Sequence, residues 1–481
     1  MNKIVGRIFA ILLALFLSVS FPLYAEEVET TATDEKEIIQ EEAVVEESQD
    51  EESTEVEESK DEESKGEESS DSEEIDEESP AEEPVVEEEP AALESLTIKH
   101  QIGDEELPAK TITADLRVLL QTLKEDVIAQ TEKQTKPFTI KTEVVGVWRE
   151  QLADSWGKLP ALAITTEIDK EGKGKSNITL PAFKKVLPDI KGEEGNATVD
   201  WKGLQGQLTF VEKFADLKTD LTIQGLLIKS EENAKENFEF TMEKTLLKGE
   251  FDADLMPTTL DFELPLLKAL GQEIQVTIQG VGFKANVKLL EQGIEISAGE
   301  FKMKQLQLTG DDVTSTFKDV ELKSDGAVEK EGVIYKINTK IGNVTLPKKA
   351  FDNLMDVDLS YMGDLELRRL DPEAIKQLQQ TAHNLRKQQQ NGEIPADMVG
   401  LTWFAKLTEL APTLLAKSPE LALSQLKLKT ADGELNGKIL VSIEGTKVSS
   451  LEDFSSLMGA LQMQADFNMA KVLLQKTMTT D

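Results

Sequence analysis

The most informative absence in this 481-residue sequence is that of cysteine. Without cysteine the chain can form no disulfide bond, no thiolate metal site, no cysteine-linked lipid anchor and no cysteine nucleophile. A chain without disulfides must be held together by its hydrophobic core. The chain is long enough to bury a large core, so this absence is compatible with a stable fold.

Residues that carry chemistry are also scarce. Neither of the two histidines, His100 and His383, has a second histidine near it in the sequence to bind a metal, and no Gly-x-Ser-x-Gly motif provides a serine nucleophile. We expect both histidines to face solvent. Carboxylates are abundant enough for an acid/base pair, but the aromatic rings with which glycosidases line their sites make up only 5% of the residues. We therefore predict a protein that is not an enzyme, with no cofactor and no metal site.

One string, EGKGKSN at 171–177, resembles a phosphate-binding loop. Such a loop needs a glycine five residues before Gly174, where this sequence has Asp169, and it must lead into a helix. Strand-like residues follow instead. We predict a hairpin turn at this place.

The charge of the chain is unevenly distributed. The formal net charge is −40, and residues 26–92 hold 32 acidic residues against three lysines. Like charges repel, and this segment has too little apolar surface to offset the entropy lost on folding, so we predict a disordered acidic low-complexity spacer. The chain has no basic patch interleaved with aromatic residues, which argues against nucleic acid as a partner.

Residues 1–25 have the pattern of a secretory signal peptide, with a basic start, an apolar run and a small residue at the end. We predict cleavage between Ala25 and Glu26. Leu23, at the −3 position, is larger than the preferred residue, so retention of this segment as an N-terminal membrane anchor stays open. No later stretch approaches the roughly 20 apolar residues that a second span needs.

Residues 93–481 alternate between apolar and polar side chains in run after run, with glycine, aspartate and asparagine between the runs. This period of two is typical of antiparallel strands with one apolar face and one solvent-exposed polar face. The predicted fold class is α+β and β-dominated: a large, elongated, mainly antiparallel curved sheet with a few helices packed on it. The size of this part allows either one elongated sheet or two subdomains.

Three stretches with helical spacing interrupt the strands. The first begins near Ala114 with Thr113 as its cap, and the second follows Asp371, which is a natural N-cap before a proline. The third follows Pro395. Pro412 should kink or end this third helix, because proline disrupts a helix interior.

The stretch LALSQLKLKTADGELNGKILVSIEG, from Leu421 to Gly445, predicts a β-hairpin. Asp432 and Gly433 have the composition of a two-residue type I′ turn. Such a turn places Leu426 opposite Ile439. Side chains alternate along a strand, so the leucines and isoleucines of the hairpin should share one face, with lysines on the other.

This alternation fails at Ser424. One extra residue near that position repairs it, so we predict a β-bulge, beyond which Leu423 faces Val441 and Leu421 faces Ile443. The repaired hairpin defines a candidate apolar sheet face. Its predicted residues are Leu421, Leu423, Leu426, Leu428, Ile439, Val441 and Ile443.

A helix, a Ser-Pro-Glu step and this hairpin follow one another in "LLAKSPELALSQLKLKTADGELNGKILVSI", with "LELRRLDPEAIKQLQQ" and "KGLQGQLTF" upstream. Over roughly Leu93 to Leu474 the chain resembles the YdgA-like family of bacterial envelope proteins. The resemblance implies a protein in the periplasm of a Gram-negative bacterium, or anchored in its inner membrane by the N-terminal segment and facing the periplasm. The family has no known function and implies no catalytic residues.

Two departures from this family bear on the expectations. Its members fold close behind an N-terminal anchor, whereas here the acidic segment intervenes. They also continue beyond the equivalent of Leu474, so a sheet edge is expected to be uncovered or paired with a partner.

Two functions of different classes follow. The first is a non-enzymatic envelope protein that binds lipid or another hydrophobic ligand on a one-faced sheet. The competing expectation is that helices and a fold-over of the sheet bury that face completely. The alternative function is structural: the protein forms a homodimer, or docks an envelope protein, through strand edges. A hydrolase would instead need a cleft with convergent, strongly shifted carboxylates.

Overall fold

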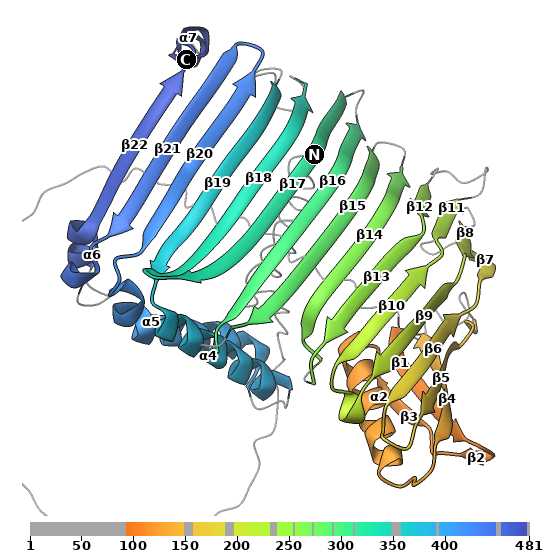
Figure 1. The fold of residues 1–481 in the computed structure, drawn as a ribbon. Coiled ribbons are helices and arrows are strands. Elements are labelled where there is room, and N and C mark those ends of the chain that lie inside the picture. Colours follow the sequence, from red (N-terminus) through yellow and green to blue (C-terminus); the bar gives the residue numbers. More distant parts are fainter. Residues whose placement is uncertain are drawn as a thin grey trace, which may run out of the picture. The chain divides into compact units, whose positions relative to one another are not determined.

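A computed structural model describes residues 93–148, 157–187, 197–230, 238–253, 255–271, 274–290, 293–310, 313–347, 357–390, 394–448 and 454–478. The predicted signal peptide of residues 1–25, its cleavage site between Ala25 and Glu26, and the predicted spacer of residues 26–92 lie outside the described residues. The described residues belong to one compact unit and form a large sheet accompanied by helices (Figure 1).

The described part of the chain contains 22 strands, which all pair in antiparallel fashion. The N-terminal strands are mostly short: β1 (Leu93–Ile102), β2 (Glu105–Glu106), β3 (Lys110–Thr113), β4 (Phe138–Trp148), β5 (Leu162–Ile168), β6 (Gly174–Leu180), β7 (Phe183–Leu187), β8 (Ala197–Trp201), β9 (Leu204–Phe210), β10 (Leu217–Ile223), β11 (Leu226–Ser230), β12 (Glu239–Met242) and β13 (Thr245–Phe251). The later strands are longer: β14 (Pro257–Leu270), β15 (Ile274–Leu289), β16 (Glu295–Gly310), β17 (Val313–Glu329), β18 (Gly332–Leu346), β19 (Val357–Leu370), β20 (Glu420–Thr430), β21 (Gly433–Ile443) and β22 (Leu461–Met469).

From β14 to β22 each strand pairs with the next one along the chain. At β14 the sheet divides. The half of β14 before Pro265 pairs with β13, and the half after it pairs with β12. Proline has no N–H to donate to a neighbouring strand, so Pro265 suits the position where β14 changes partners. One branch continues through β10, β9, β6, β5 and β4 to β1, and the other through β11 and β8 to β7.

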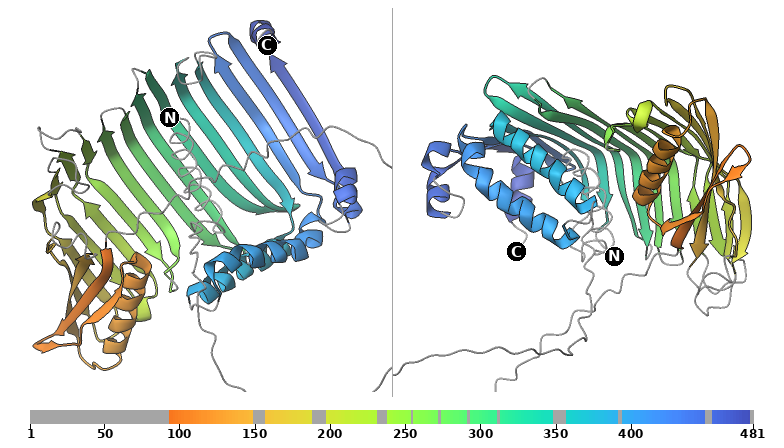
Figure 2. Two further views of the ribbon diagram at one scale, coloured as in Figure 1. Left: turned by 180° about the vertical axis from the view of Figure 1, so that it is seen from behind. Right: turned by 90° about the horizontal axis from the view of Figure 1, so that it is seen from below.

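The predicted fold class is confirmed: the sheet is large, antiparallel, open and curved, and few helices accompany it. The helices are α2 (Leu116–Thr131), α4 (Pro372–Gln390), α5 (Ala396–Leu415), α6 (Phe454–Ala460) and α7 (Lys471–Met478), with 3₁₀ turns η1 (Glu212–Phe214) and η3 (Gly445–Lys447). Figure 2 shows that α2, α4 and α5 lie on the concave side of the sheet.

The three predicted helices are present, and two details differ from expectation. Asp371 caps α4 as predicted, because its Oδ1 accepts the backbone N–H groups of Glu373 and Ala374 at 3.0 and 3.1 Å. The cap of α2 is Asp115, not Thr113, since the Asp115 carboxylate accepts the N–H of the third helical residue at 2.9 Å. Pro412 does not end α5, since the helix continues to Leu415; the other expected effect, a kink at the proline, stays a prediction.

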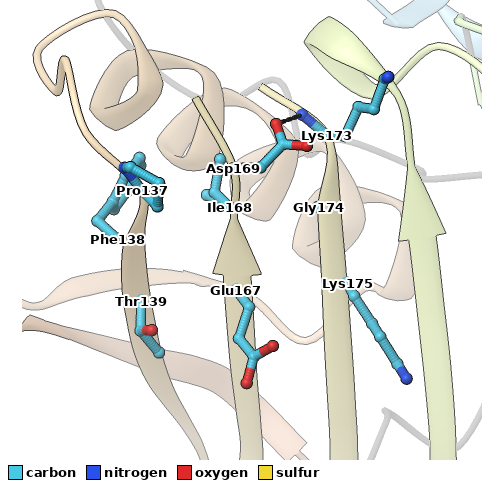
Figure 3. A pocket seen from close by; sticks show the side chains of 9 residues that line it. All are labelled: Pro137, Phe138, Thr139, Glu167, Ile168, Asp169, Lys173, Gly174 and Lys175. Atoms are coloured by element: carbon cyan, nitrogen blue, oxygen red, sulfur yellow. Dashed lines mark hydrogen bonds between the residues drawn. The ribbon is translucent and has the colours of Figure 1, made fainter. Parts of the chain in front are cut away.

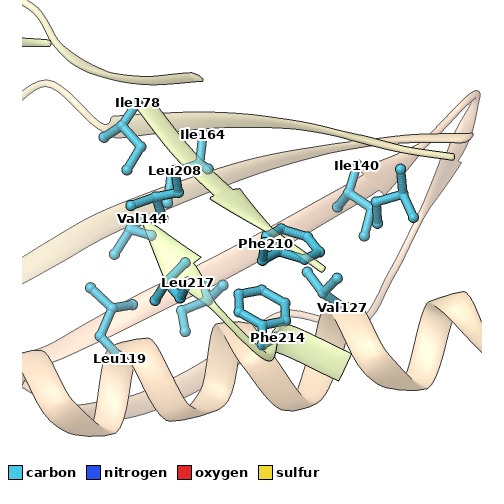
Figure 4. Packing of buried hydrophobic residues seen from close by; sticks show 12 residues of the cluster. Leu119, Val127, Ile140, Val144, Ile164, Ile178, Leu208, Phe210, Phe214 and Leu217 are labelled. Carbon is cyan, nitrogen blue, oxygen red and sulfur yellow. The ribbon is translucent and has the colours of Figure 1, made fainter. Parts of the chain in front are cut away.

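Helix α2 covers the first branch of the sheet and closes the larger hydrophobic core. Leu119 and Val127 of α2 pack against Ile140 and Val144 of β4, and all four side chains are buried (Figure 4). Full burial of such a side chain contributes about 1.5–3 kcal/mol. This cluster therefore holds the N-terminal branch together without disulfides. Its buried members are Ile98, Leu119, Val127, Ile140, Val144, Ile164, Ile168, Ile178, Leu208, Phe210, Phe214 and Leu217.

His100 lies beneath α2, and the expectation that it faces solvent is wrong. Its side chain is buried, with Nδ1 2.8 Å from the Thr142 hydroxyl and Nε2 3.0 Å from a carboxylate oxygen of Asp126 on α2. Lys110 bonds the other oxygen of the same carboxylate. The ring is buried because it links the helix to the sheet through two hydrogen bonds, which offset the cost of removing polar atoms from water.

Helices α4 and α5 pack against one end of the long strands through a second, smaller core. Ile375 of α4 and Leu414 of α5 join Ile296, Val333 and Leu370 there. The backbones approach closely beside this core: a Cβ added to Gly445 in η3 would lie 1.6 Å from the Leu415 carbonyl oxygen. The position of α5 is therefore tied to the C-terminal part of the sheet.

Candidate binding face of the sheet

The long strands place three parallel rows of side chains on one face. Each row crosses the nine strands from β14 to β22, and directly paired residues share a face in an antiparallel sheet. We call these 27 positions the apolar face. The first row is Leu260, Ala285, Gly299, Ser324, Ile337, Leu365, Leu423, Ile439 and Ala465. The middle row is Phe262, Phe283, Phe301, Leu322, Thr339, Gly363, Leu426, Gly437 and Phe467. The third row is Leu264, Val281, Met303, Val320, Ile341, Tyr361, Leu428, Leu435 and Met469.

The composition of the apolar face is the first notable property of the sheet. None of the 27 residues is charged, and the side chains that carry a polar group are Ser324, Thr339 and Tyr361. Nine strands spaced at about 4.8 Å extend the rows over about 38 Å. That length exceeds the ~15 Å that one leaflet contributes to a bilayer's hydrocarbon core. The face is therefore long enough for several acyl chains.

The second property is that described elements leave much of this face uncovered. None of its 27 residues belongs to either of the two buried clusters. Most are half-buried, Met303 is buried, and Phe467 is 52% exposed. Complete burial of this face by helices and a fold-over of the sheet is not seen in the described part of the chain, where α2 covers the first branch and α4 and α5 lie at the strand ends.

Two glycines of the middle row lie beneath aromatic rings. A Cβ added at Gly437 would lie 2.5 Å from Cδ1 of Phe467, and one at Gly363 would lie 2.2 Å from the hydroxyl oxygen of Tyr361. Aromatic rings packed over sheet glycines fill the space left by the missing side chain. The two glycines therefore leave no gap in the apolar face.

The seven residues predicted from the hairpin lie on this side of the sheet. Leu423, Leu426, Leu428 and Ile439 belong to the apolar face itself. The remaining three lie one or two rows further toward the strand ends: Leu421 pairs with Val441, and Ile443 pairs with Leu461 of β22. Their role in ligand binding remains a prediction.

The predicted bulge is present, and the predicted turn is displaced. The register shifts between Leu423 and Leu426, as expected. The turn, however, is formed by Ala431 and Asp432, and Gly433 (φ +138°) already pairs with Thr430. The predicted pairings are therefore wrong by two residues: Leu426 faces Gly437 rather than Ile439. A shift of two keeps every side chain on its face, because the strand period is two.

The opposite, convex face carries charged side chains that form ion pairs between neighbouring strands. Lys248 lies 3.2 Å from Asp220, Lys284 lies 3.0 Å from Asp261, and Lys323 lies 3.1 Å from Glu300. Hydrogen bonds from Lys302 and Lys323 hold the pKa of Glu300 below its usual value, and Asp261 raises that of Lys284. Opposite charges on facing residues stabilise a solvated face and set the register of the strands.

A depression of about 540 Å³ lies at the turn that resembles a phosphate loop (Figure 3). The predicted hairpin is present: Asp169 Oδ1 accepts the N–H groups of Glu171 and Lys173 at 2.8 and 2.9 Å. Gly174 begins a strand rather than a helix. The acidic and basic groups around the depression, Glu167 and Lys175 among them, belong to a hairpin surface. Within the described ranges no cluster of histidine and carboxylate side chains could hold a metal ion.

These features define a class of protein: an open antiparallel sheet with one apolar and one charged face, whose apolar face is covered by helices only in part. The chain belongs to a family described as bacterial protein of unknown function (DUF945), whose model matches residues 136–481. No curated protein and no solved structure matches the chain. Among the residues that the structure describes, no helix has both the length and the apolar character to cross a membrane.

Proposed function

We propose that the protein binds the acyl chains of a lipid on the apolar face, without catalysing a reaction. The observation that carries the proposal is the set of 27 uncharged positions on nine neighbouring strands, none of which belongs to a buried cluster. Contiguous exposed apolar surface beyond a few hundred Å² is uncommon in soluble monomers and marks an interaction site.

The open shape of the face favours a ligand with two chains. A chain of about 16 carbons that is fully buried gains about 12 kcal/mol, but a chain lying on an open surface buries only about half of that area. About 6 kcal/mol hardly exceeds an association cost of about 4 kcal/mol. Two linked chains lie side by side, cover each other and incur the association cost once. We therefore propose a diacyl membrane lipid rather than a free fatty acid.

The proposed location is the envelope of a Gram-negative bacterium. The resemblance to the YdgA-like proteins and the signal-like residues 1–25 support a periplasmic protein, or one anchored in the inner membrane and facing the periplasm. Either location gives the apolar face access to membrane lipid. Cell fractionation with an antibody against the folded part tests it, and recovery in the cytosolic fraction would refute it.

A lipid-extraction assay with matched variants tests the binding proposal. Vesicles of zwitterionic diacyl lipid carry a self-quenched fluorescent diacyl lipid, and extraction by the protein relieves the quenching. Thr339→Asp places a short carboxylate in the middle row, between Leu322 and Gly363. Asn436→Asp makes the same change of charge on the exposed polar face of β21. Burying an unpaired carboxylate against acyl chains costs at least ~1.4 kcal/mol, so we expect T339D to extract lipid at least 10-fold less well and N436D to match the wild type.

Two further arms of the assay keep the proposal refutable. Thr339→Val, which replaces the hydroxyl of the middle row by a methyl group, should extract lipid at least as well as the wild type. A fluorescent fatty acid should bind more weakly than the diacyl probe. Equal extraction by wild type, T339D and N436D would overturn the proposal.

A further inference from the structure

Exposed apolar side chains are concentrated at the last strand of the sheet. Among the described residues, 16 large hydrophobic side chains are exposed, and six of them lie between residues 458 and 474. Met463 is the most exposed of these, at 68%. The six residues are Met458, Leu461, Met463, Phe467, Val472 and Leu474. Such a cluster marks an interaction surface.

Strand β22 is also an unprotected edge. It pairs with β21 through all nine of its residues, and within the described part of the chain no strand pairs with its other side (Figure 1). Edge strands are commonly protected by shortness, lysine, proline or a bulge. The edge strand β7 has five residues and two lysines, Lys184 and Lys185. Strand β22 has nine residues, no lysine and no proline, and its register with β21 is regular.

The sequence of β22, LQMQADFNM, is complementary to itself when read in the opposite direction about Ala465. In that register two copies place like with like on each face. On the apolar side Met463 meets Phe467 of the second copy, and Leu461 meets Met469. On the polar side Gln464 meets Asp466, and Gln462 meets Asn468. No two like charges oppose each other, and aromatic–aliphatic and polar–polar pairs are favourable cross-strand neighbours.

We propose that β22 pairs with β22 of a second copy of this chain, in antiparallel register centred on Ala465. The interface is isologous, as a two-fold axis requires. Helix α7 follows Met469 and α6 precedes Leu461 in each chain. The register therefore brings α7 of one copy next to α6 of the other, so that exposed Val472 lies near exposed Met458. The two apolar faces become one continuous surface across the dimer axis.

Single cysteines test the register directly, because the chain has no cysteine of its own. Directly opposed residues in an antiparallel pair have Cα atoms about 4.5–5.5 Å apart, which is within the range of a disulfide. In the proposed register only Ala465 opposes itself. Met463 of one copy is displaced from Met463 of the other by four residues, about 13 Å. Under mild oxidation of the full chain we expect Ala465→Cys to form covalent dimers and Met463→Cys to stay monomeric on denaturing gels.

Charge variants on the polar side test the same contact without touching the apolar face. Gln464→Asp sets a carboxylate against Asp466 of the second copy twice per dimer, and Gln464→Lys sets a favourable pair there twice. By sedimentation equilibrium we expect Q464D to weaken dimerisation by up to ~10-fold and Q464K to strengthen it by a similar factor. Asn436→Asp, one strand further from the edge, should leave the dimer unchanged.

Several results would overturn this pairing. The first is sedimentation of the wild-type chain as a monomer up to high concentration. The second is equal cross-linking of A465C and M463C. The third is dimerisation of equal strength in Q464D, Q464K and the wild type. The pairing does not depend on lipid binding. A protein that extracts lipid as a monomer would refute the dimer alone, and a dimer that extracts none would refute the proposed function alone.

Discussion

Replacing Gly445 by alanine tests how firmly α5 is fixed to the C-terminal part of the sheet. The added Cβ would lie 1.6 Å from the Leu415 carbonyl oxygen and 2.6 Å from its carbonyl carbon. Both are backbone atoms, so no rotamer change relieves the overlap, and the end of α5 must move away from η3. Overpacking of this kind costs about 1–3 kcal/mol. Alanine also lowers the conformational entropy of the unfolded chain, which offsets about 0.4–1 kcal/mol of this cost. We therefore expect a net loss of about 1–2 kcal/mol.

Urea denaturation followed by circular dichroism measures this loss as a lower midpoint. Gly459→Ala is the matched control, because a Cβ at Gly459 in α6 meets nothing within 4 Å. Alanine is the better helix former by up to ~1 kcal/mol, so this control should be neutral or stabilising. Equal midpoints for G445A and the wild type would show that α5 and η3 do not approach as described.

Three further substitutions make separate predictions. Burial raises the pKa of Tyr335 from 10.0 to about 12, so the folded state holds this proton more tightly. Its stability should fall as pH rises from 10 to about 12, and Tyr335→Phe should remove that part of the pH dependence of urea midpoints. The pKa of Glu300 is lowered, so the ionised carboxylate stabilises the fold at pH values above its ordinary pKa, and this stabilisation is lost as the pH falls. Glu300→Gln should therefore lower the free energy of unfolding by less than about 1 kcal/mol near neutral pH. The difference from the wild type in urea midpoints should vanish in acid. His100→Phe removes the partner of the buried Thr142 hydroxyl and of one carboxylate oxygen of Asp126, whose other oxygen still bonds Lys110. It should cost about 1–3 kcal/mol in thermal unfolding. A His100→Phe chain as stable as the wild type would contradict the assigned hydrogen bonds.

Local signals in the sequence predicted much of this fold. Strand alternation, the Asp371 cap and the bulge after Leu423 each depend on residues within a few positions of one another. The turn was predicted at Asp432-Gly433 but lies one position earlier, at Ala431-Asp432, with Gly433 as the first strand residue. Composition alone does not separate these two registers.

Long-range pairing is what the sequence left undetermined. Phe262, Phe283 and Phe301 each occur in an alternating run, which was a usable signal for their strands. That they form one row with Phe467, about 200 residues away, depends on the register of every strand between them. The burial of His100 likewise depends on α2 packing over β1, the strand that carries this histidine. Neither relation has a local signature.

Lipid bound to the apolar face should remain on the protein through a purification without detergent. Native mass spectrometry of the protein purified from its cells without detergent, followed by solvent extraction of the same sample, measures this most directly. We expect adducts with the mass of a diacyl lipid that are present in the wild type and in N436D and are depleted in T339D. A wild-type protein at its bare polypeptide mass, with no lipid in the extract and none taken up from vesicles, would contradict it.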